Sequence, residues 1–221
     1  MVAARSRLTL AIVFLFVYFG RLGDAAAISP TRAWSWYKTM LKQHPLMTKS
    51  TTSSAIMTVS DVICQQITKE RPTRKNEKAP SMDYLRVLHV AITGFIWSGP
   101  VSHHWYAILE KIVKIEHPIG GLATRIFLDA MIFSPVAVSG YFSVRSILEG
   151  SNVKGIRHKL STKFVPTVVG AWKFWPAANI VNFGMVPIQF RVLYNNVLSL
   201  FWTGYLTHVN AKARQMAVKA P

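Results

Sequence analysis

The sequence predicts an all-α protein, a polytopic bundle of transmembrane helices, and three observations support this fold class. First, 51% of the 221 residues are hydrophobic and only 16% are charged, with a mean hydropathy of +0.25. A soluble domain usually carries about 25% charged residues. Second, apolar stretches alternate with short basic connections. Third, polar side chains within the apolar stretches recur at helical spacing, so several helices would carry one polar face.

The N-terminal segment combines a basic start, a stretch of thirteen uncharged residues and a small-residue exit. Arg5 and Arg7 come first, and alanines at 25–27 end the segment. This layout is typical of a secretory signal, since its apolar core is shorter than the about 20 residues of a membrane span. The basic start, with no acid before Asp24, also suits import into an organelle. We interpret residues 1–30 as a hydrophobic targeting extension.

An interfacial helix is expected at residues 31–49. Trp34 and Trp36 stand close to Lys38 and Lys42 in this segment. Aromatic rings and long cationic side chains both favour the headgroup layer of a membrane.

The first membrane span is expected at about 47–67, and it is strongly patterned. Such a helix would not be stable alone in lipid, because its polar face must contact other helices or water. Apolar residues follow the same rhythm on another face. The polar face consists of Ser54, Thr58, Asp61 and Gln65.

The second and third spans are expected at about 84–109 and 124–148. In the third span, Arg125 and Asp129 stand one helical turn apart. A pair of opposite charges at this spacing is a local way to neutralise a carboxylate within the membrane. We therefore predict an ion pair between these two side chains.

The C-terminal part contains two more apolar segments, at about 164–183 and 187–208, after a predicted basic loop or interfacial turn at 149–163. They are either two spans, or one span with a re-entrant or interfacial partner. We therefore expect four principal membrane helices, the interfacial helix and a fifth apolar segment. One polar face on the fourth segment carries Trp172, Trp175, Asn179 and Asn182; one on the fifth carries Arg191, Asn195, Leu198, Trp202 and Tyr205.

The polar faces are the feature most relevant to function. One hypothesis is a water-lined pathway for small solutes, since mixed carboxylates, cations and amides would give a weakly selective pore. The alternative is that these groups hydrogen-bond across helices and fix their packing. For Asp61 and Asp129 the functional interpretation is favoured, because a carboxylate in mid-membrane costs about 2.5 kcal/mol or more. The candidates for the pore lining or polar interior are Asp61, Gln65, Arg86, His89, Arg125, Asp129, Asn179, Asn182 and Arg191.

A non-transporting scaffold or assembly factor is the alternative from a different functional class. An enzyme is not expected, because the sequence has no phosphate-binding glycine loop, metal-ligand spacing or nucleophile elbow. We predict no catalytic residue, cofactor or metal site. His103 and His104 cannot easily ligate one ion, since adjacent residues on a helix point about 100° apart.

The net charge of +17 comes from 26 basic and 9 acidic residues. These basic residues lie between apolar stretches rather than on one solvated face, so we expect no direct binding of nucleic acid. The expected partners are a bilayer with anionic headgroups, small solutes and, in a homo-oligomer, further copies of the chain. The single cysteine, Cys64, excludes an internal disulfide.

An ordered set of landmarks covers residues from about 34 to 208. Its upstream members are Trp36-Tyr37, Leu41, His44-Pro45, Asp61 with Gln65, Gly99-Pro100 and His103-Trp105-Tyr106. Its C-terminal members are Trp172, Trp175-Pro176, Asn179, Asn182-Phe183, Val186-Pro187, Arg191, Asn196, Trp202 and Tyr205-Leu206. The set resembles the signature of the Mpv-seventeen and peroxisomal membrane protein family. Asp129-Ala130 departs from the Asp-Gln that is usual in that family.

The resemblance implies a small, four-helix-type integral protein of the mitochondrial inner membrane or the peroxisomal membrane. Members have been linked to channel-like passage of small solutes and to mitochondrial homeostasis. We therefore expect an organellar channel or regulator of solute passage, with the mitochondrial inner membrane preferred and the peroxisome as alternative. The resemblance also favours an organellar leader over a cleaved secretory signal. The expected domains are the 1–30 extension, one membrane-embedded domain at 31–210 and a basic tail at 211–221.

Overall fold

The protein is helical throughout its described part. The computed structural model describes residues 29–69 and 82–202, and every regular element in these ranges is a helix. The all-α class is therefore confirmed, whereas most of the 1–30 extension and the whole 211–221 tail lie outside the described residues. The α-helices are α2 (Pro30–Gln43), α3 (Pro45–Lys69), α4 (Tyr84–Thr93), α5 (Gly99–Ile112), α6 (Pro118–Leu128), α7 (Ser134–Leu148) and α8 (Val153–Gly184).

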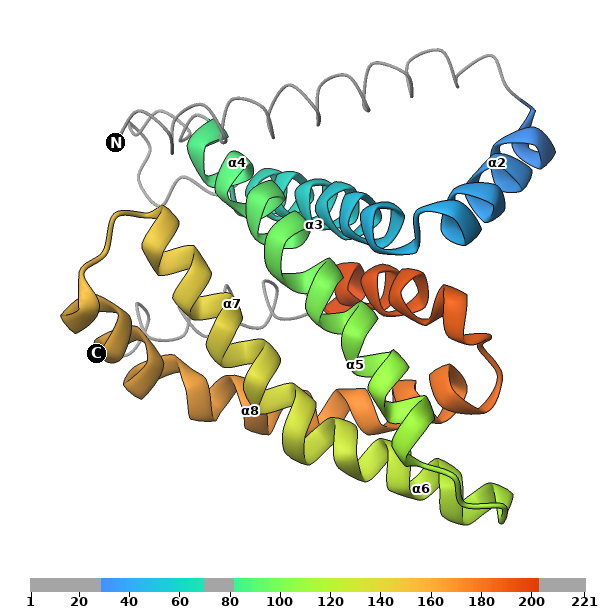
Figure 1. Cartoon of the computed structure of the whole chain (residues 1–221). Coiled ribbons are helices and arrows are strands. Elements are labelled where there is room, and N and C mark those ends of the chain that lie inside the picture. The colour runs from blue at the N-terminus through green and yellow to red at the C-terminus, as the bar shows by residue number, and fades with distance from the viewer. Residues whose placement is uncertain (1–28, 70–81, 203–221) are drawn as a thin grey trace.

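These elements join into longer rods that cross one another (Figure 1). A π-helical turn, η2 (Gly94–Ser98), joins α4 to α5, and a second, η3 (Asp129–Phe133), joins α6 to α7. α3 packs against α4 and α5, α4 packs against α7, and both α6 and α7 pack against α8. The C-terminal apolar run forms two helices, because a break and the 3-10 turn η4 (Ile188–Phe190) separate α8 from a helix at 191–202.

Two helices begin earlier than the sequence predicted. The predicted basic loop at 149–163 is wrong for most of its length, because α8 begins at Val153. The side chain of Asn152 caps this helix by accepting a hydrogen bond from the N–H of Gly155 at 2.9 Å. α6 likewise begins at Pro118 rather than near residue 124. Hydropathy locates the apolar part of a helix, whereas a capping side chain decides where the helix starts.

Each π-helical turn is followed, after one residue, by a proline. η2 precedes Gly99-Pro100, and η3 precedes Ser134-Pro135. A proline within a helix has no N–H to donate, and its ring collides with the carbonyl four residues earlier. A wider turn relieves this collision and lets the rod continue.

The π turn η2 also allows two helices to approach closely. The N–H of Gly99 donates to the carbonyl of Gly94 across η2, so the two glycines lie one above the other. In a regular α-helix, residues five apart would point about 140° apart. A Cβ on Gly94 would lie 2.8 Å from the Cα of Ser54, and one on Gly99 would collide with the Cα of Ser50. Small residues on both helices therefore bring α3 and the α4–α5 rod into backbone contact.

Polarity in this molecule is arranged opposite to that of a soluble protein. Among the described residues, sixteen polar or charged residues are buried against ten apolar ones, although soluble interiors are mainly apolar. On α3, Val59, Ile63 and Ile67 are 50%, 41% and 51% exposed, whereas Asp61 and Gln65 are buried. The polar face predicted for this helix thus points inward, and an apolar exterior suits contact with lipid.

One helix of the described part, Pro118–Leu148, is long and apolar enough to cross a membrane by length and composition alone. It has 31 residues and a mean hydropathy of 1.5. Inward polar residues lower the hydropathy of other helices, as on α3. The count of four principal spans stays a prediction.

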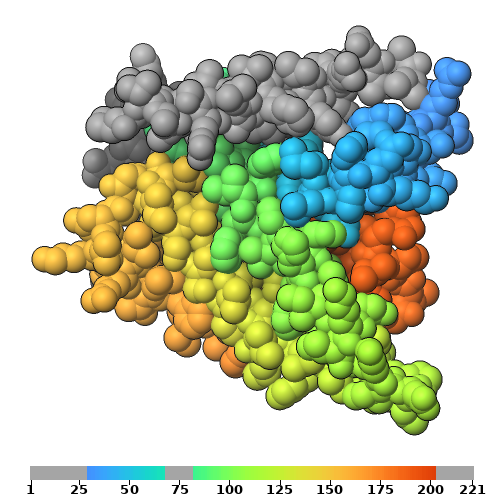
Figure 2. All heavy atoms as spheres, in the orientation of Figure 1, coloured from blue at the N-terminus to red at the C-terminus, as the bar shows by residue number. Residues whose placement is uncertain are grey.

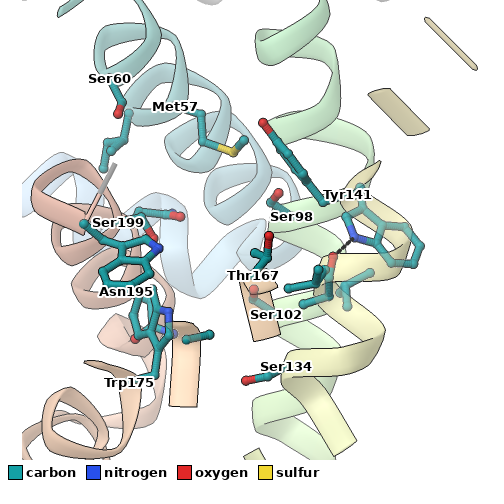
Figure 3. Close-up of a pocket in the computed structure, with 18 of the residues that line it drawn as sticks. Met57, Ser60, Ser98, Ser102, Ser134, Tyr141, Thr167, Trp175, Asn195 and Ser199 are labelled. Atoms are coloured by element: carbon teal, nitrogen blue, oxygen red, sulfur yellow. Dashed lines mark hydrogen bonds between the residues drawn. The ribbon is translucent and has the colours of Figure 1, made fainter. Parts of the chain in front are cut away.

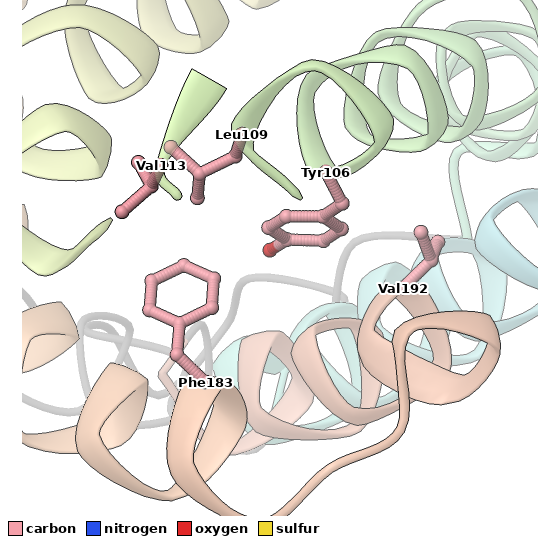
Figure 4. Close-up of a cluster of buried hydrophobic side chains, with 5 residues drawn as sticks. All are labelled: Tyr106, Leu109, Val113, Phe183 and Val192. Carbon is pink, nitrogen blue, oxygen red and sulfur yellow. The ribbon is translucent and has the colours of Figure 1, made fainter. Parts of the chain in front are cut away.

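The apolar part of the interior is small and lies where three helices meet. Tyr106 and Leu109 of α5 are fully buried and pack with residues from α8 and from the helix at 191–202. At another edge, α2 lies beside the C-terminal segment (Figure 2). The apolar cluster consists of Tyr106, Leu109, Val113, Phe183 and Val192 (Figure 4).

Candidate functional site

The helices surround a cavity of about 440 Å³ (Figure 3). Among the described α-helices, α2 and α6 do not contribute to its wall. In the view of Figure 3, the polar side chains lie on two sides of an open space. Ser98, Ser102, Ser134 and Tyr141 lie on one side, and Ser60, Asn195 and Ser199 on the other.

Hydroxyl, amide and carboxylate groups supply the polar lining of this cavity. Its two charged residues are Asp61 and Asp129, and the described lining contains no Lys, Arg or His. Ser60 is buried, and its Oγ has no hydrogen-bond partner within the described part of the chain. A buried hydroxyl at the wall of a partly polar cavity is a natural partner for water or for a polar solute.

Asp61 joins α3 to α4 through the first of three polar networks. Its Oδ1 accepts a hydrogen bond from Nε of Arg86 at 2.8 Å and lies 2.8 Å from Nη2 of the same guanidinium. Its Oδ2 accepts one from Nε2 of Gln65, also at 2.8 Å. Oε1 of Gln65 in turn accepts a hydrogen bond from the backbone N–H of Asp83 at 2.8 Å. The structure thus brings together three of the nine candidates, and their contacts hold the end of α3 against the start of α4.

Asp129 occupies the first position of η3 and is buried, at 3% exposure. Its Oδ1 accepts a hydrogen bond from the indole N–H of Trp105 at 2.9 Å, and its Oδ2 accepts one from Asn179 at 2.7 Å. The predicted ion pair with Arg125 is therefore wrong. Two neutral donors from other helices satisfy the carboxylate, so it needs no cation one turn away.

Amide groups continue this network toward the C-terminal helix. Nδ2 of Asn182 donates to Oδ1 of Asn195 at 3.0 Å and lies 3.5 Å from Oδ1 of Asn179. Asn195 also donates to the hydroxyl of Tyr106. Within the described residues, Oδ1 of Asn182 is buried and has no partner. α5, α8 and the helix at 191–202 are therefore connected by side chains that are polar but uncharged.

Arg125 and Arg191 meet at Glu110, outside the cavity. Nη1 of Arg191 lies 3.0 Å from Oε2 of Glu110, and Nη2 of Arg125 lies 3.7 Å from Oε1. Arg125 also donates to the carbonyl of Val113 at 3.3 Å. The last candidate, His89, is half-buried on α4 and does not line the cavity.

Of the nine sequence candidates, only Asp61 and Asp129 line the cavity. The serines of the wall escaped the sequence reasoning, which weighed charged and amide groups first. Helical spacing could have found them, because Ser98 and Ser102 are four residues apart, as are Asn195 and Ser199.

The paired histidines have separate contacts. Nδ1 of His103 lies 3.1 Å from Nζ of the buried Lys49, whereas His104 is exposed. No group of three potential metal ligands occurs among the described residues.

Tryptophans of the C-terminal signature line the cavity or join helices, and its prolines lie within α8 or next to η4. Trp175 and Trp202 line the cavity, and Trp202 also stacks on Phe174 at 4.8 Å. The indole N–H of Trp172 donates to the carbonyl of Ala130 at 2.8 Å. This bond holds α8 against η3, where a π turn leaves carbonyls displaced from regular helical geometry. Pro176 lies within α8, and Pro187 directly precedes η4.

Several known proteins are similar in sequence to this chain over most of its length. A model of the Mpv17 / PMP22 family matches residues 146–207. Peroxisomal membrane protein 2 of Bos taurus is 33% identical over 177 residues, which are 80% of this chain and 89% of that protein. PXMP2/4 family protein 2 of Dictyostelium discoideum is 31% identical over 81% of this chain and 91% of its own length. Protein SYM1 of Saccharomyces cerevisiae is 29% identical, with 81% and 90% covered.

No solved structure matches the chain. The extent of the bovine match, together with the ordered signature and its positions in the fold, identifies the relationship. The chain belongs to the Mpv17/PMP22 family.

Proposed function

We propose that this protein is an integral membrane protein of an organelle and provides a weakly selective pathway for small solutes. The observation that carries the proposal is a cavity in which hydroxyl, amide and carboxylate groups interrupt a mainly apolar lining, inside a molecule with many exposed apolar side chains. In lipid, such a lining is costly unless its groups contact one another or water.

The size and charge of the cavity support small polar solutes. Its volume of about 440 Å³ falls within the roughly 300–1,000 Å³ of small-molecule sites. Both carboxylates of the lining already accept hydrogen bonds, and the described lining has no Lys, Arg or His side chain that would attract an anion. Uncharged polar solutes should therefore pass best, and anions should pass least well.

For the organelle, we propose the mitochondrial inner membrane, with the peroxisomal membrane as the alternative. A basic leader without acid before Asp24 supports the first, and the name of the bovine relative supports the second. Fractionation of cells that express a C-terminally tagged chain distinguishes the two. A glycosylated or secreted product would contradict both.

Solute flux through the purified protein tests the pathway itself. The full chain, reconstituted in liposomes, should release uncharged polyols at a rate that falls with solute size. Ser102→Phe would fill the cavity and should lower the rate several-fold. The matched control is Ile108→Phe, because Ile108 lies on the same helix and is 48% exposed. An absence of flux and of single-channel conductance from folded, inserted protein would refute the pathway.

A non-transporting scaffold is the second candidate function. It is favoured by one observation: the charged and amide groups of the interior are mostly paired with one another across helices. If the pairing is purely structural, the unaltered chain should not conduct solutes. Ser102→Phe and Ile108→Phe should then assemble with the partners of the protein as well as the unaltered chain does. The flux measurement separates the two candidates.

A further inference from the structure

A second cavity, of about 430 Å³, lies between α2 and η4, away from the central one. α2 and the C-terminal segment lie against each other at this edge of the molecule (Figure 2). The groove combines two lysines with hydroxyl and amide groups and two apolar side chains. Its lining consists of Ser35, Lys38, Thr39, Leu41, Lys42, Gln189 and Phe190.

An aromatic stack holds the two sides of this groove together. The ring of Trp34 on α2 stacks on Phe190 of η4, with centroids 5.2 Å apart and planes inclined by 22°. Trp34 also stacks on Tyr37 at 5.8 Å, and the hydroxyl of Tyr37 lies 3.3 Å from that of Thr52 on α3. Gln189 is therefore held opposite the face of α2 that carries the lysines.

The positive charge of the groove is not paired with a carboxylate within the part of the chain that the structure describes. Lys38 and Lys42 are one helical turn apart, and neither takes part in an ion pair within the described residues. No Asp or Glu occurs between residues 25 and 60. A concave site with two uncompensated ammonium groups is complementary to an anion.

The surroundings of the groove indicate which anion it would meet. Trp34 and Trp36, on the same helix, are each 45% exposed, and exposed indoles favour the headgroup layer. Ile188, next to Gln189, is 38% exposed. In the headgroup layer of a membrane, the anion next to apolar side chains is the phosphate of a phospholipid, whose acyl chains lie beside it.

We propose that the groove between α2 and η4 binds the headgroup of an anionic phospholipid. The ammonium groups of Lys38 and Lys42 contact the phosphate, Gln189 offers its amide to the glycerol region, and Phe190 packs against the first acyl carbons. The site rests on the proposed membrane location but is independent of solute passage.

The test is a lipid titration of the purified full chain in neutral detergent, read by native mass spectrometry. Phosphatidylglycerol and phosphatidylcholine with identical acyl chains are the two probes. Lys38→Gln/Lys42→Gln should weaken phosphatidylglycerol binding about thirty-fold, and Lys42→Gln alone about five-fold. Lys111→Gln/Lys114→Gln is the matched control, because it removes two charges that are also exposed but lie elsewhere.

The expected result is tighter binding of phosphatidylglycerol than of phosphatidylcholine, lost in the groove variant and kept in the control. Equal loss in both double variants would reduce the effect to general surface charge and overturn the proposal. So would unchanged binding in the groove variant. Displacement of the lipid by millimolar inorganic phosphate would assign the groove to free phosphate instead. Polyol flux of the groove variant in phosphatidylcholine liposomes should match that of the unaltered chain, which keeps this test separate from that of the pathway.

Discussion

The close approach of α3 to the α4–α5 rod gives the most sharply defined prediction. In Gly94→Ala, the new Cβ would lie 2.8 Å from Cα of Ser54 and 3.1 Å from the carbonyl oxygen of Ser53. Both are backbone atoms, so no side chain can move aside. Overpacking of this kind costs about 1–3 kcal/mol, and alanine recovers about 0.5–1 kcal/mol of helix propensity. The free energy of unfolding should therefore fall by up to about 2.5 kcal/mol, and by roughly 1 kcal/mol at the middle of these ranges.

Gly170→Ala is the matched control for this substitution. Gly170 is also within a helix, but its Cβ would lie 3.8 Å from the ring of Trp202, an ordinary contact. The control should be neutral or more stable by about 0.5–1 kcal/mol, since only the propensity gain applies. Unfolding in mixed micelles with increasing sodium dodecyl sulfate, followed by far-ultraviolet circular dichroism, measures both variants. If Gly94→Ala is as stable as Gly170→Ala, the close-packing argument is refuted.

Two ion pairs give further predictions. A double-mutant cycle with Asp61→Asn and Arg86→Met should yield a coupling energy of about 1 kcal/mol in the same unfolding assay. The energy is modest because the Arg86 side chain is half exposed. Strictly additive effects of the two substitutions would mean that the ion pair contributes nothing to stability. At the α7–α8 turn, burial raises the pKa of Glu149, but the hydrogen bond from Lys159 and the charge of Arg145 outweigh it and hold the pKa below its usual range. The carboxylate thus stabilises the fold above the unfolded pKa of about 4.3, and this stabilisation is lost as pH falls through the lower folded value. The stability difference between the unaltered chain and Glu149→Gln should be present at pH 7 and vanish in acid, whereas a pH-independent difference would show that ionisation is not its cause.

Helical periodicity was sufficient to predict the inward face of α3. The spacing of Asp61 and Gln65 depends only on the geometry of one helix, so the sequence alone indicates that both share a face. Their partner Arg86 was also singled out, but its contact with Asp61 was not foreseen. That contact depends on how far α3 and α4 are shifted along each other, which no pattern within one segment encodes.

The π turns and contacts between distant segments explain two further features that the sequence could not predict. A rule based on 3.6 residues per turn assigns Gly94 and Gly99 to different faces, although η2 aligns them. The same rule paired Arg125 with Asp129, whereas the arginine contacts Glu110 and the carboxylate faces indole and amide donors. Donors from distant segments are invisible to a search for partners one turn away.

The division of polar groups in the interior also bears on the choice between pathway and packing. The carboxylate oxygens of Asp61 and Asp129 are engaged by donors from other helices, so these groups contribute to the assembly of the bundle. Ser60 lines the same cavity, and its buried hydroxyl has no such partner among the described residues. If both functions coexist, substitution of the charged residues should mainly change stability, and substitution of the serines should mainly change flux. Pathway and packing are then roles of different side chains around one cavity rather than competing explanations of the same ones.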